Sequence, residues 1–194
     1  MFIEGCWKVR NITVAVESGV MDADEVREWA ESYDESYDEG LHDIEQTLHK
    51  ALQEQGYITR EQLRDVVTWK LDNQAGRRSG NIERVNRVPD EYVRRVSEAA
   101  LVVDDPEIQL KTLSSIPGIG YATATVVLTF YDPERYAVGD RYMVDLFFGE
   151  DRQMRVTDYP KLLSELRERN PGEFELRTVE KAYYQRYREE NDIA

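Results

Sequence analysis

The sequence LSSIPGIGYATATVVLTFYDPERYAVGDRYMVDLF, residues 113–147, decides the fold. Its centre, Ile116-Pro117-Gly118-Ile119-Gly120, lies between two segments with helical apolar spacing. Two glycines around one apolar residue permit a tight hairpin, and the helix that follows presents unpaired amides at the positive end of its dipole. Such a hairpin is suited to bind a backbone phosphate without regard to nucleotide sequence. An ordinary packing corner between two helices would show the same pattern.

The residues around the hairpin resemble the helix-hairpin-helix (HhH-GPD) DNA glycosylase superfamily, the endonuclease III-like and 8-oxoguanine glycosylase-like proteins. In that family a Leu-Pro-Gly-Val-Gly hairpin precedes Thr-Ala, an apolar helix and a Val-Asp turn. The counterparts here are IPGIG, Thr123-Ala124, the VVL run at 126–128 and Ala137-Val138-Gly139-Asp140. A family hairpin position and the aspartate lie 18 residues apart, as do Ala122 and Asp140. Residues 105–150 carry the resemblance, and the remainder agrees only in being helical.

The resemblance implies one glycosylase-like unit over residues 1–194, with a mostly α, two-lobed fold. It implies binding of double-stranded DNA and hydrolysis of the N-glycosidic bond of a damaged or modified base, in the manner of base excision repair. Asp140 would be the catalytic residue. Ala122 stands where bifunctional members have a Schiff-base lysine, and an alanine cannot form an imine. The expected enzyme is therefore a monofunctional glycosylase.

The chemistry explains an aspartate at position 140. Cleavage of an N-glycosidic bond develops positive charge on the sugar, which a fixed carboxylate in a water-poor cleft stabilises. A plain N-cap of the following helix accounts for Asp140 equally well, and the two roles are compatible.

The expected DNA contacts include arginines as well as the hairpin. Residues 76–95 contain six arginines and three acids, which suits a phosphate-contacting edge, although solvated helix arginines explain them nearly as well. Arg141 could reach a phosphate or pair with Asp140. The predicted DNA-binding residues are Pro117, Gly118, Ile119, Gly120, Ala122, Thr123, Arg77, Arg78 and Arg141.

A glycosylase must hold an extruded base against aromatic or apolar faces. We predict Trp69, Lys70 and Tyr131 as the base pocket, because Trp69-Lys70 precedes a glycine-bearing segment expected to border the cleft. Phe130 and Tyr136 are further candidates. Aromatic residues are more often part of the core, and a helix lysine is more often solvated.

Composition excludes several classes of protein. With Cys6 as the one cysteine, and His42 and His49 as the two histidines, no disulfide framework, iron-sulfur cluster or zinc site is expected. No organic cofactor is expected either; the resemblance suggests a monovalent cation at the hairpin carbonyls. No apolar run could span a bilayer and the start lacks a signal peptide, so a cytoplasmic, nucleoid-associated monomer is expected.

The net charge of −14 argues at face value against a DNA partner. However, residues 17–55 contain 13 acids and two basic residues, so most of the excess lies in one segment. The 19 arginines against six lysines fit either a salt-adapted cytoplasm or a GC-rich genome. The charge distribution therefore leaves a DNA-binding surface open.

Local patterns predict eight to ten helices. Residues 2–16 suggest a short strand or hairpin, Asp22 caps a helix to about residue 33, and Thr59 with Gln62 opens another. Residues 73–82 are expected to be a loop at a lobe boundary. Further helices are expected at about 41–52, 118–131, 160–169 and 178–190. Three more are expected to begin near Pro89, near Pro106 and at 140.

Two alternatives to the enzyme remain open at this point. The chain could be a non-catalytic DNA-binding protein that keeps the hairpin, or a helical interaction protein that keeps only the fold.

Overall fold

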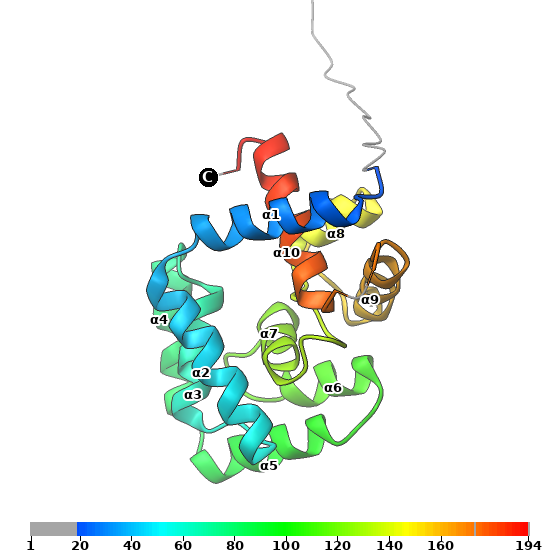
Figure 1. Cartoon of the computed structure of the whole chain (residues 1–194). Helices are drawn as coiled ribbons and strands as arrows, with labels where there is room; N and C mark the ends of the chain where they lie inside the picture. The colour runs from blue at the N-terminus through cyan, green and yellow to red at the C-terminus, as the bar shows by residue number, and fades with distance from the viewer. Residues whose placement is uncertain (1–18, 173, 194) are drawn as a thin grey trace, which may run out of the picture.

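The computed structural model describes residues 19–172 and 174–193, and this part of the chain is α-helical with no strand (Figure 1). The strand or hairpin expected within residues 2–16 lies outside it. The helices are α1 (Ala23–Ser36), α2 (Glu39–Gln55), α3 (Arg60–Lys70), α4 (Ala75–Asn86), α5 (Asp90–Leu101), α6 (Pro106–Leu113), α7 (Tyr121–Tyr131), α8 (Arg141–Phe148), α9 (Tyr159–Glu168) and α10 (Leu176–Glu190), with a 3₁₀ turn at Val156–Asp158. In these residues, no helix is long and apolar enough to cross a membrane.

Most helix starts follow the predicted capping residues. Asp22 accepts the amides of Asp24 and Glu25 and forms a capping box at the start of α1. Thr59 accepts the amide of Gln62 and forms a capping box at the start of α3. Pro106 occupies the first turn of α6, as predicted, whereas Pro89 is the N-cap of α5, one residue before the first turn. The mostly α fold class and the number of helices are confirmed in the described residues.

The loop predicted for residues 73–82 is wrong, because α4 begins at Ala75. The turn between α3 and α4 is confined to residues 71–74. Only Val85 of α4 is buried, so the segment has almost no apolar periodicity to reveal a helix. Its glycines, Gly76 and Gly80, each cost about 1 kcal/mol relative to alanine in a helix, a cost that packing elsewhere outweighs.

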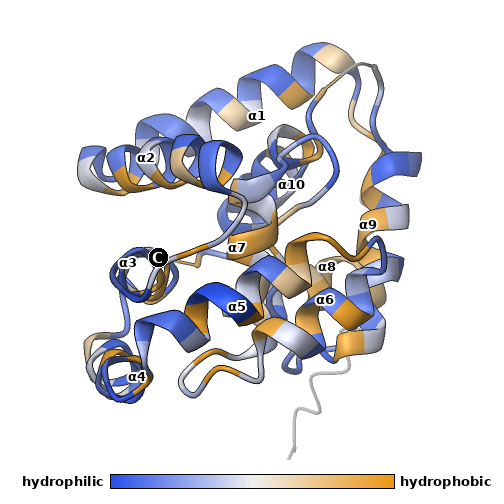
Figure 2. Ribbon diagram, turned by 90° about the horizontal axis from the view of Figure 1, so that it is seen from below, coloured by the Kyte–Doolittle hydropathy of each residue, from blue (hydrophilic) through white to orange (hydrophobic). Residues whose placement is uncertain are grey.

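The centre of the molecule is α7, which the other helices surround (Figure 1). Residues 123–130 of this helix are all buried, and Figure 2 shows it as mostly apolar. It packs against α2, α3 and α6, while α1 lies along α10, and α8 and α9 pack together and against α10. The first helix therefore packs on the last, and α9 also contacts α6.

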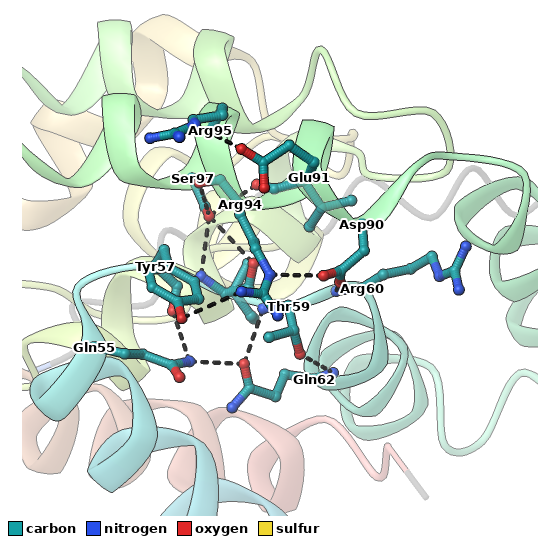
Figure 3. Close-up of polar contacts among 12 residues, drawn as sticks. Gln55, Tyr57, Thr59, Arg60, Gln62, Asp90, Glu91, Arg94, Arg95 and Ser97 are labelled. Carbon is teal, nitrogen blue, oxygen red and sulfur yellow. Dashed lines mark hydrogen bonds and ion pairs between the residues drawn. The ribbon is translucent and has the colours of Figure 1, made fainter.

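A polar cluster far from the hairpin fastens α3 to α5 (Figure 3). Asp90 accepts the amide of Arg60 at 2.8 Å and the Nε of Arg94 at 2.6 Å. The buried Ser97 hydroxyl accepts the amide of Ile58 at 3.0 Å. Because these contacts satisfy backbone amides at the entry to α3, they fix where that helix starts.

Two glycines make close approaches that a side chain would prevent. Gly118 has a φ of +96°, and a Cβ there would lie 2.7 Å from the Asn81 carbonyl oxygen of α4. Gly139 has no left-handed backbone, but a Cβ would lie 2.6 Å from Met154 Sδ. The contact of Gly118 docks the hairpin on α4, which explains why α4 persists despite its weak sequence pattern.

Replacement of Gly118 by alanine should therefore destabilise the fold by about 1–3 kcal/mol, because it adds left-handed strain and a clash with backbone. Gly120→Ala is the matched control, since Gly120 has a φ of −93° and its Cβ would meet nothing within 4 Å. Urea unfolding of the two variants measures the difference. Equal midpoints for the two would contradict the docking of Gly118 on α4.

Candidate active site

The hairpin places unpaired amides at the start of α7. The Ile119 amide donates to the Ile116 carbonyl at 3.0 Å, which closes the turn. Gly120 is the N-cap of α7, and no side chain caps that helix. In the described part of the chain, the amides of Gly120, Tyr121 and Ala122 donate to no backbone or side-chain oxygen. They are available to an anion, and the helix dipole favours one there.

A threonine inside α7 connects the hairpin helix to the next candidate residue. The buried Thr125 hydroxyl donates to the Ala122 carbonyl at 2.8 Å and accepts the Gly139 amide at 3.0 Å. Gly139 has no Cβ, so its backbone can pack against Met154, Tyr159 and Leu162 at the same time. The residue after it, Asp140, is thereby held at a fixed position relative to the start of α7.

Asp140 is both the N-cap of α8 and one half of an ion pair. Its Oδ1 accepts the amides of Tyr142 at 2.9 Å and Met143 at 3.2 Å. Its Oδ2 accepts a hydrogen bond from Lys70 Nζ at 2.8 Å. The side chains of Lys70 and Asp140 are only 13% and 14% exposed. The carboxylate is therefore oriented by three donors from two helices.

Asp140, Lys70 and the hairpin line one cleft of about 990 Å³, at the upper end of the size range of ligand sites. The cleft walls come from both ends of the chain: α1, α2, α3, α4, the hairpin, α8 and α10 all contribute. Six aromatic residues contribute to its lining: Tyr33, Tyr37, Trp69, Tyr121, Tyr142 and Tyr184. Flat apolar faces beside a carboxylate suit an aromatic ligand.

These rings pack against one another as well as facing the cleft. Tyr33 and Tyr37 are stacked, with centroids 4.6 Å apart, and Tyr37 is 5.9 Å from Trp69. Phe130 supports Trp69 from its edge at 5.1 Å. The buried Nε1 of Trp69 has no hydrogen-bond partner among the described residues. Trp69 is thus held rigidly and retains an unused donor.

A buried ionic cluster joins α10 to α1 and α2 behind this wall. Arg177 donates to Glu45 through Nε at 3.0 Å and Nη2 at 3.1 Å, to the Tyr33 hydroxyl at 3.1 Å, and to Glu180 Oε2. Its guanidinium also lies 5.3 Å from the centroid of the Trp69 ring. Burial raises the pKa of Glu45, but the charge and hydrogen bonds of Arg177 more than offset this and hold it below its ordinary value.

Arginines lie at the cleft surface and leave it less acidic than the chain as a whole. Arg77 donates to Gln74 and Arg84 to Asn81, both neutral side chains. Arg141 makes a long ion pair of 4.0 Å with Asp151, and its guanidinium lies 4.8 Å from the centroid of the Tyr142 ring. Arg188 also lines the cleft, and its Nε donates to a backbone carbonyl. These four guanidinium groups keep donors for an incoming polyanion.

The structure brings most of the sequence-predicted site together. Asp140, Lys70, Trp69, Arg77 and Arg141 line the cleft, with the hairpin residues Gly118, Ile119, Gly120, Ala122 and Thr123. Pro117, Arg78 and Tyr131 are outside the lining: Pro117 is exposed beside it, and Arg78 pairs with Asp72 at 3.3 Å. Phe130 and Tyr136 are core residues, 2% exposed each. The sequence is compatible with Lys70 either as a solvated lysine or as a pocket residue. In the structure, Lys70 pairs with Asp140.

Sequence reasoning missed the wall contributed by α10 and α1. Arg177, Glu180, Tyr184 and Arg188 are spaced by three or four residues, which places them on one face of α10. That spacing in the sequence indicates a shared helix face and could have predicted this wall. Tyr183, on another face of α10, packs inward: it is 1% exposed and contacts Phe147.

The described residues contain no group of histidine, cysteine, aspartate and glutamate that could hold a metal ion. At the hairpin, the Leu113 and Ile116 carbonyls each accept one amide from within the turn. In comparisons with family models, curated proteins and solved structures, none matches the chain. The site must therefore be interpreted from its own geometry.

Replacement of Arg177 by methionine should cost about 3–5 kcal/mol at pH 7, because it removes the cation that the buried Glu180 and the half-buried Glu45 share. The cost should shrink toward pH 5. Arg177 lowers the folded pKa of Glu45, and without it Glu45 can bind a proton on acidification. Urea unfolding at both pH values measures this.

Arg87→Met is the control for this comparison, since Arg87 pairs with Glu83 on the exposed surface of α4. Such pairs contribute at most about 1 kcal/mol. Similar losses for Arg177→Met and Arg87→Met would show that the buried cluster does not hold the helices together.

Proposed function

We propose that this chain is a helix-hairpin-helix glycosylase that hydrolyses the N-glycosidic bond of a damaged or modified base in double-stranded DNA. The observation that carries the proposal is the joint placement of Asp140 and the open amides of α7 in one aromatic-walled cleft. A nucleic-acid phosphate and a reacting sugar need these two features side by side. The two-lobed HhH-GPD fold is part of the proposal.

In the proposed complex the hairpin amides bind a DNA phosphate, and the arginines at the cleft contact neighbouring phosphates. Amide donors have no net charge, so this contact does not require a basic protein. The target nucleotide is extruded into the cleft, at a cost of a few kcal/mol, and its base stacks on aromatic faces there. Tyr37 and Tyr121, which line the cleft and are partly exposed, are the candidates for that stacking, whereas Trp69 is 3% exposed and supports the wall from the core.

Asp140 acts on the sugar. As the C1′–N bond breaks, its carboxylate stabilises the positive charge that develops on the sugar ring and orients the water that adds to C1′. In the free protein, the Lys70 ammonium cancels part of the field of Asp140. An entering phosphate competes for that ammonium, since Lys70 reaches the pair through a flexible side chain.

The Lys70 ion pair also favours the alternative of a DNA-binding protein without catalysis, in which the pair is purely structural. A panel of single-lesion duplexes, treated with alkali after incubation to reveal abasic sites, separates the two. Salt-dependent duplex binding without abasic sites would support the non-catalytic protein. Absence of both binding and abasic sites would support the helical interaction protein.

Gly120→Asp should weaken duplex binding at least tenfold, because it places a carboxylate at the phosphate position. It should not lower the melting temperature, since aspartate is a favourable N-cap and the Cβ meets nothing within 4 Å. Gly120→Asn is the matched neutral control. Fluorescence anisotropy with a labelled duplex measures binding. Equal affinity of the Asp and Asn variants would exclude the hairpin as the phosphate contact.

Asp140→Asn should reduce base excision by about 10² to 10³ while leaving duplex binding within a few fold. The asparagine oxygen can still accept the amides of Tyr142 and Met143, so the cap of α8 is preserved. Single-turnover excision on a duplex that the parent processes is the measurement. An unchanged rate would assign Asp140 to capping alone.

A further inference from the structure

The buried cluster behind the cleft has one carboxyl group more than its cation can balance. Arg177 and Glu45 form a two-pronged pair, with hydrogen bonds of 3.0 and 3.1 Å from Nε and Nη2. Glu180 receives a single hydrogen bond, from Arg177 Nη1 to its Oε2. Within the described part of the chain, the hydrogen bond to Glu180 comes to its Oε2 and none comes to its Oε1. Arg177 thus holds Glu45 through two hydrogen bonds and Glu180 through one, and both carboxyl groups share its single charge.

The surroundings of Glu180 offer no second cation free to pair with it. From α3 and the start of α8, Lys70 and Asp140 face it as an ion pair of zero net charge. From α1, the Tyr33 hydroxyl is neutral, and Lys181 on α10 pairs with Asp34 at 2.9 Å. A carboxylate that is 2% exposed and without its own cation is costly.

The burial of Glu180 therefore penalises its ionised form. Burial raises the pKa of Glu180, and the opposing charge and hydrogen bond of Arg177 do not bring it back to its ordinary value. For Glu45 the balance is reversed: the charge and hydrogen bonds of Arg177 outweigh burial, and its pKa lies below the ordinary value. The count of charges and the burial lead to the same conclusion.

Glu180 and Asp140 line the same cleft in opposite environments. Three donors orient the Asp140 carboxylate, one of them an ammonium, whereas Glu180 is enclosed with only a share of Arg177. Two carboxyl groups whose surroundings separate their protonation states are the arrangement that enzymes use for a charge stabiliser and a general acid.

We propose that Glu180 is the acid that protonates the departing base, and that the substrate is a neutral base with an accepting ring nitrogen or carbonyl oxygen. This rests on the glycosylase function proposed above. A base that carries a positive charge through alkylation leaves without a proton and would not need Glu180.

In the proposed step, the C1′–N bond breaks and its electron pair stays with the base, which takes the proton from the Glu180 carboxyl. Water adds to C1′ and releases one proton, which restores the proton of Glu180 through the cleft and solvent. The overall change is hydrolysis, with no oxidant or reductant. Arg177 assists because it already donates to Glu180 and stabilises the carboxylate left behind.

The first test is independent of activity. Infrared difference spectra of the parent and Glu180→Gln at pH 7 should show a protonated carboxyl band in the parent that the variant lacks. The variant should melt close to the parent, because a glutamine of the same size still accepts from Arg177. Absence of the band would show that Glu180 is ionised and would overturn the assignment, whether or not the chain is a glycosylase.

The second test follows single-turnover excision against pH. On neutral lesions that the parent processes, Glu180→Gln should lose about 10² to 10⁴ in rate, the usual contribution of general acid catalysis, and should lose the alkaline fall of the parent profile. A duplex with cationic 7-methylguanine, if processed, should be slowed less than tenfold. Duplex binding should be unchanged within twofold. Equal losses on neutral and cationic lesions, or an unchanged rate and pH profile, would contradict the role.

The two proposals fail in different ways. A parent that forms abasic sites in no duplex refutes the glycosylase function and the catalytic step, while the infrared band still reports the proton on Glu180. A parent that forms them, with an equally active Glu180→Gln variant, refutes the role of Glu180 alone.

Discussion

The two-pronged ion pair between Arg177 and Glu45 is the interaction on which the arrangement of the cleft depends. It ties α10 to α2, and the same guanidinium bonds Tyr33 of α1 and lies over the Trp69 ring of α3. Buried ion pairs add little net stability relative to apolar packing, but breaking one is costly. Its contribution is thus positional: it fixes the elements that line one side of the cleft, although they come from opposite ends of the chain.

The other side of the cleft is held by the apolar core. Residues 123–130 of α7 are fully packed, so its N-terminus cannot shift relative to the surrounding helices. The Thr125 hydroxyl of α7 accepts the amide of Gly139, the residue before Asp140. This hydrogen bond fixes the position of Asp140 relative to α7. Burial therefore holds the start of α7 in place on one side of the cleft, and the Arg177–Glu45 ion pair holds the elements on the other side. Both make the groups that line the cleft rigid.

The sequence predicted the elements whose signals are local. The caps at Asp22 and Thr59, the hairpin and α7 needed only spacing and propensity, and the structure confirms them as helix boundaries. The sequence did not reveal α4, since a helix docked through Gly118 and Val85 needs almost no apolar stripe. Nor could it reveal that Lys70 reaches Asp140 over 70 residues, because ion pairs between distant helices depend on the packing of the whole chain.

The acidity of the chain and the proposed DNA partner can be reconciled through where the charges lie. The acids gathered in residues 17–55 fall largely on α1 and α2, whereas α4, the hairpin and the start of α8 contribute arginines and open amides to the cleft. α1 and α2 also line part of the cleft, and Asp38 lies in its wall. At physiological salt, exposed charges are screened beyond about 8 Å, so a phosphate at the hairpin would interact mainly with the charges nearest to it. Amides also release fewer counterions than lysines when they bind phosphate. A hairpin of this kind can therefore operate on an acidic protein, and its affinity would be less sensitive to salt than that of a basic patch.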